Sequence, residues 1–194
     1  MIEIVNVNKS WGIGAAGDLL INIPGDMKFF RETTRGSVCI MGSTTLDSFP
    51  GMRPLKNRVN IVLIDDEKKI RREALAGAAA DKAAGLATEL IYVRSLEEAV
   101  ALGRRYEAGE FDNCGVEFPR KVFVIGGATI YRIMLPYCDT CMVTINDCAR
   151  EADTYFPDLA ADGQWEMTEE GEPQVYEAPE GESVSYRFTK WVRR

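Results

Sequence analysis

The chain has 194 residues, 46% of them hydrophobic and 27% charged, which predicts one soluble globular domain with a core of its own. A formal net charge of −7 and a pI near 4.8 argue against a surface for nucleic acid or for an anionic membrane. The sequence has no histidine, which excludes Ser-His-Asp and Cys-His catalytic systems and every histidine-containing zinc site.

The N-terminal segment Met1-Ile2-Glu3-Ile4-Val5 has no basic region, no long apolar region and no cleavage site, so no export signal is expected. The apolar runs, such as residues 59–64, are too short to span a bilayer. These features predict a cytoplasmic protein.

Apolar β-branched runs alternate with helical stretches along the chain. The middle runs are apolar throughout, as in strands buried on both faces, whereas the last run alternates like a half-exposed antiparallel strand. Strands are predicted at 2–7, 38–41, 59–64, 90–93, 122–125, 141–145 and 183–192. Helices are predicted at 26–34, from a capping box at Ser95 to about 109, and at 127–135. The order predicts a single α/β domain over 1–194, with a central, mostly parallel twisted sheet, an antiparallel C-terminal edge and flanking helices.

Two stretches have the composition of surface insertions. Residues 67–88 are rich in Ala, Lys, Arg and Glu with weak periodicity, which fits a surface helix or a mobile loop. Residues 107–120 are predicted to form a loop. The acidic segment 166–182 contains two prolines and is expected to be a hairpin connection with a solvated surface.

The five cysteines include the spacing Cys138-x-x-Cys141, which occurs in redox motifs and zinc knuckles. A second pair of metal ligands is missing, and neither residue stands at a helix start, where a thiolate would be favoured. We therefore expect buried or incidental reduced thiols, with a redox or metal role as the alternative. The other three cysteines are Cys39, Cys114 and Cys148.

Asp26 stands at the start of an apolar helix, in the run Pro24-Gly25-Asp26-Met27-Lys28-Phe29-Phe30. An aspartate at such a position commonly caps the helix. With apolar residues on both sides, the same carboxylate could instead be partly buried and directed into a pocket. The residues alone leave both interpretations open.

Two strand-to-helix turns have features that suit a bound phosphate. Gly126-Gly127 lets the backbone approach a ligand closely, and Met41-Gly42-Ser43-Thr44-Thr45 offers hydroxyls and free amides. A simple tight turn explains either one equally well. Two such turns after buried strands suggest a dinucleotide, although neither matches the Rossmann or the P-loop motif.

Further motifs follow one another along the chain. They are Trp11-Gly12-Ile13-Gly14, Gly17-Asp18-Leu19-Leu20, Ile23-Pro24-Gly25-Asp26-Met27-Lys28-Phe29-Phe30-Arg31, Ile40-Met41-Gly42, Arg53-Pro54-Leu55-Lys56-Asn57-Arg58, Val124-Ile125-Gly126-Gly127 with Ile130-Tyr131, Leu135-Pro136, Thr144-Ile145 and Asp153-Thr154-Tyr155-Phe156-Pro157. In this order and spacing they are similar to the motifs of the dihydrofolate reductase family, and only the two insertions fall outside the resemblance.

The resemblance implies the reduction of 7,8-dihydrofolate to tetrahydrofolate by hydride from NADPH, as part of one-carbon metabolism. It implies that Asp26 pairs with the N3–H and the 2-amino group of the pterin, and that Thr144 fixes this carboxylate. Arg58 would bind the glutamate α-carboxylate of folate, its alternative being an exposed surface arginine. The other residues implied to contact the substrate are Ile4, Val5, Met27, Phe30, Phe49 and Leu55.

For the cofactor, the resemblance implies a nicotinamide against Asn6, Ile13, Gly14 and Ile125, beneath a mobile loop at 12–23. It also implies a cis peptide at Gly126-Gly127. The full set of cofactor-binding residues that it implies is Asn6, Ile13, Gly14, Gly17, Leu19, Gly42, Ser43, Thr44, Thr45, Leu63, Asp65, Arg94, Ile125, Gly126, Gly127, Ala128, Thr129, Ile130 and Tyr131.

The chain departs from the family pattern where relatives hold the 2′-phosphate of the cofactor. Ser43 replaces Arg or Lys, and Ile64 replaces Ser or Thr. Asp65 would repel a phosphate and suits a ribose 2′-hydroxyl, whereas Arg94 could compensate. We therefore expect NADPH with weak selectivity against NADH. Ile21, where many relatives have Trp, and Gly25, where Glu or Ala is usual, bear on rate and inhibitor fit.

Two alternatives remain at this level. One is a pteridine or riboflavin-pathway reductase on the same fold, which Arg58 and Asp26 argue against. The other is a degenerate nucleotide-binding protein that has lost turnover. The expected partners are dihydrofolate and antifolate inhibitors, with no nucleic acid, no membrane and no metal, and the expected assembly is a monomer.

Overall fold

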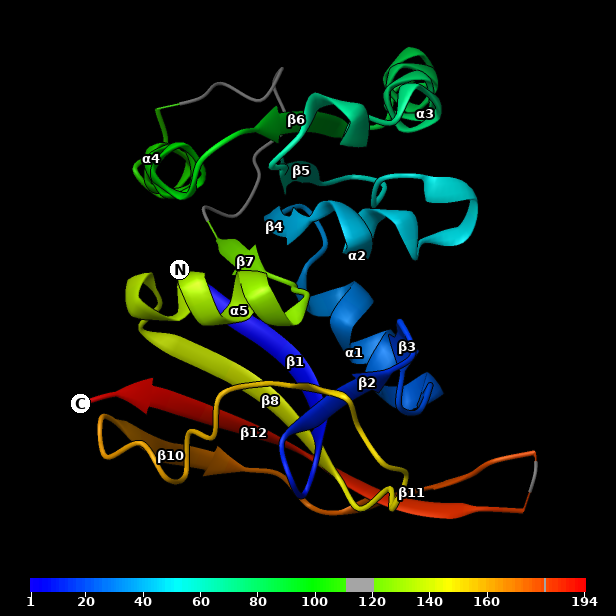
Figure 1. Ribbon diagram of the computed structural model, residues 1–194, viewed down its shortest axis with the longest axis vertical. Coiled ribbons are helices and arrows are strands. Elements are labelled where there is room, and N and C mark those ends of the chain that lie inside the picture. Colours follow the sequence, from blue (N-terminus) through cyan, green and yellow to red (C-terminus); the bar gives the residue numbers. More distant parts are fainter. Residues whose placement is uncertain (111–120, 180) are drawn as a thin grey trace. The chain divides into compact units, whose positions relative to one another are not determined.

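The computed structural model describes residues 1–110, 121–179 and 181–194, and these residues form two compact units (Figure 1). Unit 1 consists of Met1 and residues 34–137, and unit 2 consists of residues 2–33 and 138–194. Most of the loop predicted at 107–120, including Cys114, lies outside the described residues.

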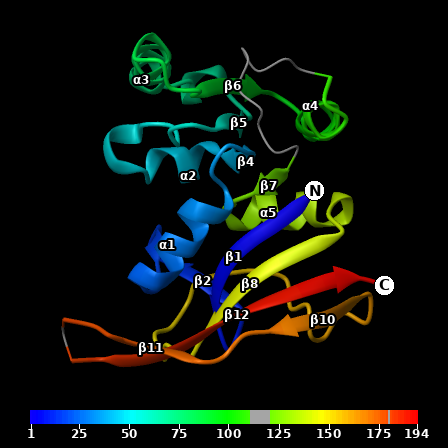
Figure 2. The ribbon, with the colours of Figure 1, turned by 180° about the vertical axis from the view of Figure 1, so that it is seen from behind.

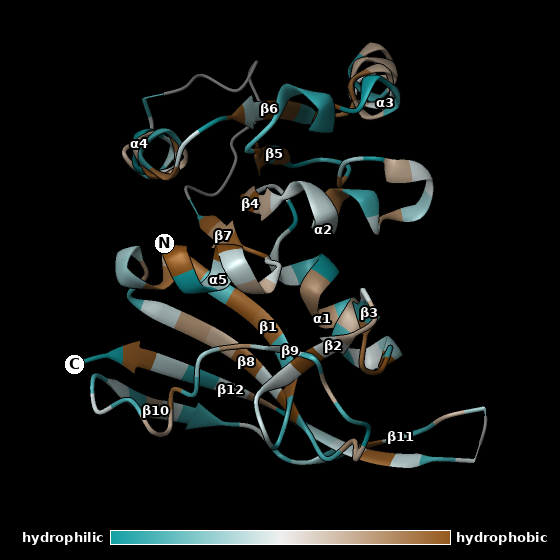
Figure 3. Ribbon diagram, viewed as in Figure 1, coloured by the Kyte–Doolittle hydropathy of each residue, from teal (hydrophilic) through white to brown (hydrophobic). Residues whose placement is uncertain are grey.

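Unit 1 contains four parallel strands in the order β7-β4-β5-β6. Every residue of β4 and β7 is buried, as expected for apolar strands that are covered on both faces. Figure 3 shows these two strands in the brown of hydrophobic residues. The bounds are β4 Val38–Gly42, β5 Val59–Leu63, β6 Glu89–Val93 and β7 Val122–Val124.

The helices of unit 1 cover these strands, and β6 lies between α3 and α4 in both views (Figures 1 and 2). The predicted cap at Ser95 is confirmed, since its hydroxyl accepts the backbone N–H of Glu98 at 3.1 Å. Residues 72–83 of the stretch 67–88 form a helix, and Ala74, Gly77 and Ala78 on it are small enough to bury against the unit. The bounds are α2 Ser43–Asp47, α3 Arg72–Ala83, α4 Leu96–Glu107 and α5 Ala128–Met134, with 3-10 turns at Pro50–Met52, Glu67–Lys69 and Leu135–Tyr137.

Unit 2 contains strands in the order β10-β12-β8-β1, and β11 also pairs with β12. β1 is parallel to β8, whereas β12 runs antiparallel to β8, β10 and β11. The predicted antiparallel edge and the alternating burial of the last strand are therefore confirmed. The bounds are β1 Ile2–Asn8, β8 Thr140–Asn146, β10 Trp165–Glu170, β11 Gln174–Glu177 and β12 Ser183–Arg193, with α1 at Pro24–Thr33.

The acidic segment 166–182 was expected to be a hairpin connection, but it contains strand residues. It forms most of β10 and all of β11, both of which pair with β12. Its residues are almost all exposed, so the expectation of a solvated surface is confirmed. The strands were missed because their charged residues hide the apolar alternation on which strand prediction depends.

A small sheet of three strands, β3-β2-β9, was not predicted. It consists of β2 Gly12–Ala15, β3 Asp18–Leu19 and β9 Thr154–Tyr155. The turn before β2 is fixed by Asn8, whose side-chain oxygen accepts the backbone N–H groups of Ser10 and Gly12. Trp11 follows with a φ of 63°, and its indole stacks on Phe156 and meets Trp191 edge-on. Among the described residues, no helix is long and apolar enough to cross a membrane.

Candidate active site

Asp26 is partly buried, and each of its carboxylate oxygens accepts a hydrogen bond. Thr144 Oγ1 donates to Oδ1 at 2.6 Å, and Asn6 Nδ2 donates to Oδ2 at 2.9 Å. Burial raises the pKa of this carboxyl above its ordinary value, and the two hydrogen bonds oppose that rise because they favour the charged form. The side chain is thus held inside unit 2 rather than directed into bulk water.

The helix-cap interpretation of Asp26 is wrong. α1 begins two residues earlier, at Pro24, where the missing N–H of proline leaves no helix bond unmade. Asp26 therefore lies in the first turn, and its carboxylate bonds to β8 and β1 instead of to its own helix.

The register of β1 and β8 brings the two donors together. Asn6 lies opposite Thr144 in this parallel pair, so both side chains point to the same face. Asn146, two residues beyond Thr144 on the same face, donates to Asn6 Oδ1 at 2.7 Å. The hydrogen bond between Asn146 and Asn6 was not predicted, because the neighbours of a strand residue depend on the register of the two strands.

Gly25 allows the first turn of α1 to approach β12. A Cβ atom at this position would overlap the hydroxyl oxygen of Tyr186 and would lie 3.0 Å from its Cζ. The Tyr186 hydroxyl is fixed in turn, because it donates to Gln174 Oε1 at 2.8 Å. Close packing against a tyrosine therefore explains the unusual glycine that precedes Asp26.

Gly25→Ala is expected to lower the free energy of unfolding by about 1–3 kcal/mol, the usual cost of an overpacked contact. Because the tyrosine hydroxyl is the nearest obstacle, the penalty should be smaller in a Tyr186→Phe background. Urea unfolding of the two single variants and the double variant measures this coupling. Strictly additive losses would show that Tyr186 is not what requires glycine here.

The predicted substrate residues of unit 2 lie on β1 and α1. Ile4 and Val5 are both buried, but they are neighbours in a strand, so only the Ile4 side chain shares a face with Asn6. Phe30 is half-buried, and Met27 is 38% exposed, enough to leave its side chain accessible to a ligand. Phe29, which was not singled out, packs on Phe188 with 4.3 Å between ring centroids.

Arg58 in unit 1 is buried, which excludes the alternative of an exposed surface arginine. Its Nε donates to Thr34 Oγ1 at 3.0 Å and its Nη1 to the carbonyl of Lys56 at 2.6 Å. Phe49 and Leu55, also predicted to contact the substrate, are half-buried in this unit.

The two turns that were predicted to bind phosphate are adjacent within unit 1. The backbone N–H of Gly42 donates to the carbonyl of Gly126 at 2.8 Å. The Gly126-Gly127 peptide is cis, as the resemblance implied. Gly126 has a φ of 102°, and a Cβ there would lie 2.7 Å from the ring of Tyr131, so both backbone conformation and space require glycine.

The first turns of α2 and α5, which follow these strands, lack side-chain caps. Gly42 and Gly127 occupy the cap positions and have no side chain to offer. A Cβ at Gly127 would lie 3.6 Å from Thr45 Oγ1, so the two turns face each other closely. The neighbouring predicted residues are divided by exposure, with Ser43, Ile125, Ile130 and Tyr131 buried, Ala128 partly buried, and Thr44 and Thr129 exposed.

The two predicted charged residues that follow β5 and β6 each form an ion pair with a residue of the 3-10 turn at Glu67–Lys69. Asp65 forms an ion pair with Lys69 at 2.5 Å, and Arg94 pairs with Glu67. Leu63, the remaining predicted residue of this region, is half-buried. Neither Lys69 nor Glu67 was singled out from the sequence, because only the 3-10 turn between β5 and α3 brings them back to these partners.

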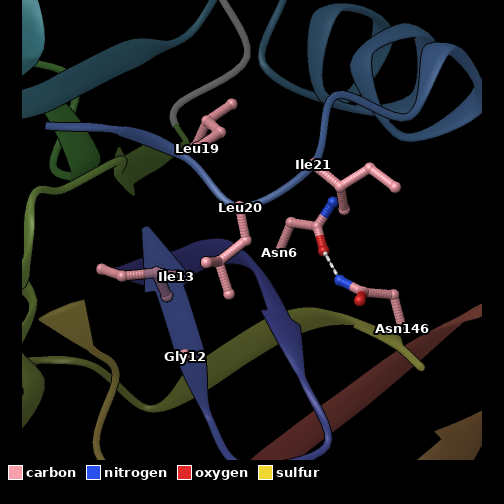
Figure 4. Close-up of a pocket in the computed structure, with 7 residues that line it drawn as sticks. All are labelled: Asn6, Gly12, Ile13, Leu19, Leu20, Ile21 and Asn146. Carbon is pink, nitrogen blue, oxygen red and sulfur yellow. Dashed lines mark hydrogen bonds between the residues drawn. The ribbon is translucent and has the colours of Figure 1, made fainter. Parts of the chain in front are cut away.

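In unit 2, Ile13 and Leu19 line a small pocket together with Asn6, Gly12, Leu20, Ile21 and Asn146 (Figure 4). Gly14 pairs with Leu19 in the small sheet, and Gly17 forms the turn between their strands with a φ of 89°. These positions belong to the segment 12–23 that was expected to be a loop, and most of it is a hairpin.

The four described cysteines, Cys39, Cys138, Cys141 and Cys148, are buried, and none of these four forms a disulfide bond. Burial raises the pKa of Cys39 to about 12 and that of Cys141 above its ordinary range, so these two thiols stay protonated and unreactive. Within residues 1–110, 121–179 and 181–194, no group of three or more acidic or cysteine side chains has a metal-binding arrangement. The structure thus supports buried, reduced thiols.

The structure is thus a mixed α/β fold in which a partly buried carboxylate accepts two side-chain hydrogen bonds. Residues 1–193 match the family model for dihydrofolate reductase, so the chain belongs to the dihydrofolate reductase family.

Individual relatives agree with this assignment. The chain is 30% identical to dihydrofolate reductase of Mycobacterium tuberculosis (strain H37Rv) over 179 residues, which are 92% of this chain and 83% of the relative. It is 31% identical to dihydrofolate reductase HdrB of Haloferax volcanii over 159 residues, 81% of this chain and 70% of that protein. The solved structure of Enterococcus faecalis dihydrofolate reductase with NADP(H) and RAB-propyl is 23% identical, with a TM-score of 0.72, and the match covers 100% of this chain and 95% of the other. This likeness confirms the predicted fold class.

Proposed function

We propose that this chain reduces 7,8-dihydrofolate to tetrahydrofolate, with NADPH as the hydride donor. The observation that carries the proposal is the doubly hydrogen-bonded carboxylate of Asp26 in a member of the dihydrofolate reductase family. The relatives described above are named dihydrofolate reductases, and the solved neighbour was complexed with NADP(H). The family membership does not favour a pteridine or riboflavin-pathway reductase.

Asp26 is suited to bind the N3–H and the 2-amino group of a pterin. A carboxylate offers about four lone-pair positions, and Thr144 and Asn6 each occupy one, on different oxygens. The remaining positions can accept two parallel N–H donors, which is a geometrically specific pairing. Asp26 would polarise the pterin and raise the basicity of N5, while water delivers the proton to N5.

Further residues are proposed to contact the substrate within each unit. In unit 2, these are Ile4, Val5, Met27 and Phe30, which give apolar surface near Asp26. In unit 1, Phe49 and Leu55 would contact the substrate, and Arg58 would bind its glutamate carboxylate. Because Thr34 and Lys56 already hold this guanidinium in place, little side-chain entropy would be lost on binding an anion.

The glycine turns of unit 1 fit a dinucleotide. Side chains are absent at Gly42 and Gly127, and the uncapped first turns of α2 and α5 leave backbone N–H groups for phosphate oxygens. We propose that residues 42–45 and 127–130 hold the phosphates, with Gly126 and Tyr131 also at the cofactor. Leu63, Asp65 and Arg94 would bind the adenosine half, and Asn6, Ile13, Gly14, Gly17, Leu19 and Ile125 the nicotinamide half. When bound, the reduced nicotinamide supplies the hydride.

The ion pair between Arg94 and Glu67 is expected to weaken selectivity for NADPH. The carboxylate of Glu67 competes with a 2′-phosphate for the guanidinium, and both side chains are about two-thirds exposed. Glu67→Gln removes this competitor, so KM for NADPH should fall about 1.5- to 5-fold, the range for exposed ion pairs, whereas KM for NADH should not change. Steady-state kinetics with both cofactors measures the difference.

Glu110→Gln is the matched control, because Glu110 pairs with Arg105 in a similarly exposed ion pair at 2.9 Å. This variant should leave both KM values unchanged. Equal changes in KM for NADPH and for NADH in Glu67→Gln would show that Arg94 does not bind the 2′-phosphate.

The decisive assay follows the oxidation of NADPH or NADH in the presence of dihydrofolate and its block by a diaminopyrimidine antifolate. Turnover that requires dihydrofolate is expected. Cofactor binding without turnover would instead identify a degenerate nucleotide-binding protein. We further propose that the enzyme acts in the cytoplasm as a monomer and binds antifolate inhibitors.

A further inference from the structure

Asn146 has a side-chain amide whose orientation is fixed by the backbone. Its Oδ1 accepts the backbone N–H of Cys148 at 2.9 Å, and its Nδ2 donates to the carbonyl of Val7 at 2.9 Å. Rotation of the amide by 180° would place a donor opposite an N–H and an acceptor opposite a carbonyl. Nδ2 of Asn146 therefore points to Asn6, and Figure 4 shows this contact between the two side chains.

Asn6 receives its orientation from Asn146. Because Asn6 Oδ1 accepts from Asn146 Nδ2 at 2.7 Å, its own Nδ2 is turned to the other side, where it meets Asp26 Oδ2 at 2.9 Å. A flipped Asn6 would set oxygen against the carboxylate and nitrogen against nitrogen, so both contacts select the same orientation. The hydrogen bond from Asn146 to Asn6 therefore fixes which Asp26 oxygen, Oδ2, accepts the N–H of Asn6.

The groups that face Asp26 from the packed strands are Asn6 on β1, Thr144 on β8 and Tyr186 on β12. Tyr186 is a neutral phenol, since burial, and then the charge of Asp26, raise its pKa. The two hydrogen-bond donors are thus the groups here that favour the charged form of the carboxyl against the opposing effect of burial. Thr144 has a hydroxyl that can rotate, whereas Asn6 has no freedom to reverse its role.

We propose that Asn6, oriented by Asn146, is a positioning residue that keeps Asp26 ionised in one fixed orientation and thereby sets the pH range of catalysis. The inference deepens the proposed function and rests on it for the link to turnover. Asn6 then orients the Asp26 carboxylate in addition to its proposed contact with the nicotinamide, and Asn146 acts through Asn6.

The test compares Asn6→Ala, which removes the donor, with Asn146→Leu, which keeps the donor but releases its orientation. The Asp26 carboxyl is titrated directly by carbon NMR of labelled protein, with the resonance assigned by its absence in Asp26→Asn. Loss of a hydrogen bond to a charged group should raise the Asp26 pKa by about one to two units in Asn6→Ala. A smaller shift in the same direction is expected in Asn146→Leu.

The pH profile of kcat/KM for dihydrofolate provides the second readout. The midpoint assigned to Asp26 should move by the same amount as the directly titrated carboxyl, which a purely structural loss would not produce. Thr189→Val serves as the control, because this buried hydroxyl donates to the Val143 carbonyl at 2.8 Å in the same unit, on the face of the sheet opposite to Thr144. It should lower the stability and leave the Asp26 midpoint in place.

A folded Asn6→Ala with an unchanged Asp26 midpoint would overturn the inference, as would an equal shift in Thr189→Val. Because the NMR titration needs no substrate, it tests the inference even if the unmodified protein fails to reduce dihydrofolate. That failure would contradict the proposed function alone.

Discussion

Asp26→Asn is expected to lower kcat/KM for dihydrofolate about 10²- to 10³-fold at neutral pH, the usual cost of removing one preoriented electrostatic group. The substitution keeps the shape of the side chain but removes the negative charge that would polarise the pterin. It also places an amide against two donors, Thr144 and Asn6, of which only the hydroxyl can rotate to accept. Stopped-flow measurement of hydride transfer tests the prediction.

Binding of NADPH provides the internal control for this variant. Fluorescence titration should give a nearly unchanged Kd, because Asp26 is not among the residues proposed to bind the cofactor. If turnover also remained unchanged, Asp26 would have no role in the chemistry.

Glu3 on β1 is expected to make the stability of the protein depend on pH. Its side chain is fully buried, and neither carboxylate oxygen has a hydrogen-bond partner in the described part of the chain. Burial raises its pKa from the ordinary 4.5 to about 9, against the opposing charge of Arg193. The thiol of Cys141, which pairs with Glu3 in the β1–β8 register, is neutral and cannot stabilise a negative charge.

The sign of the effect follows from proton linkage. The folded state keeps the proton on Glu3 up to about pH 9, whereas the unfolded chain releases it near pH 4.5. The contribution of Glu3 to stability is therefore fully present below pH 4.5, and it falls between pH 4.5 and 9 by about 1.4 kcal/mol per pH unit. By pH 7 the loss amounts to about 3 kcal/mol.

Glu3→Gln resembles the protonated side chain at every pH, so this variant should match the unmodified protein near pH 4.5 and be more stable by about 3 kcal/mol at pH 7. Urea unfolding across this pH range measures both quantities. Glu166→Gln, which alters an exposed carboxylate of the same unit that pairs with Arg194 at 3.5 Å, should change the stability at pH 7 by less than about 1 kcal/mol. Parallel pH curves for Glu3→Gln and the unmodified protein would rule out a neutral Glu3.

The sequence was sufficient to predict the strands with apolar runs. All seven predicted strands are present. Buried strands such as β4 and β7 are short apolar runs, the pattern that is typical of parallel strands covered on both faces. The helices α1, α4 and α5 were also located to within about two residues, which is the usual uncertainty of helix ends. Capping residues and prolines marked where they begin.

Short or charged strands were not predictable, because their pairing depends on distant partners. β2, β3 and β9 have two to four residues each and no apolar pattern of their own. The Ala-rich stretch of α3 left helix and loop undecided, since only contact with the rest of unit 1 shows which alanines are buried.

The candidate site was predictable only in part. Asp26 and Thr144 were paired through the family resemblance, and the structure brings them within 2.6 Å. The amides of Asn6 and Asn146 lie 140 residues apart in sequence, so no local pattern reveals their contact. The direction of this contact depends further on the backbone N–H of Cys148, just beyond the end of β8, which only the folded chain brings to Asn146.

The indole contacts around Trp11 have a practical consequence for every unfolding experiment suggested above. The chain has three tryptophans, at positions 11, 165 and 191, and all of them belong to unit 2. Tryptophan fluorescence will thus follow the loss of unit 2 and will contain no tryptophan signal from unit 1. The thiol of Cys39, buried in β4, offers a reporter for unit 1, since its rate of labelling measures how often that unit opens.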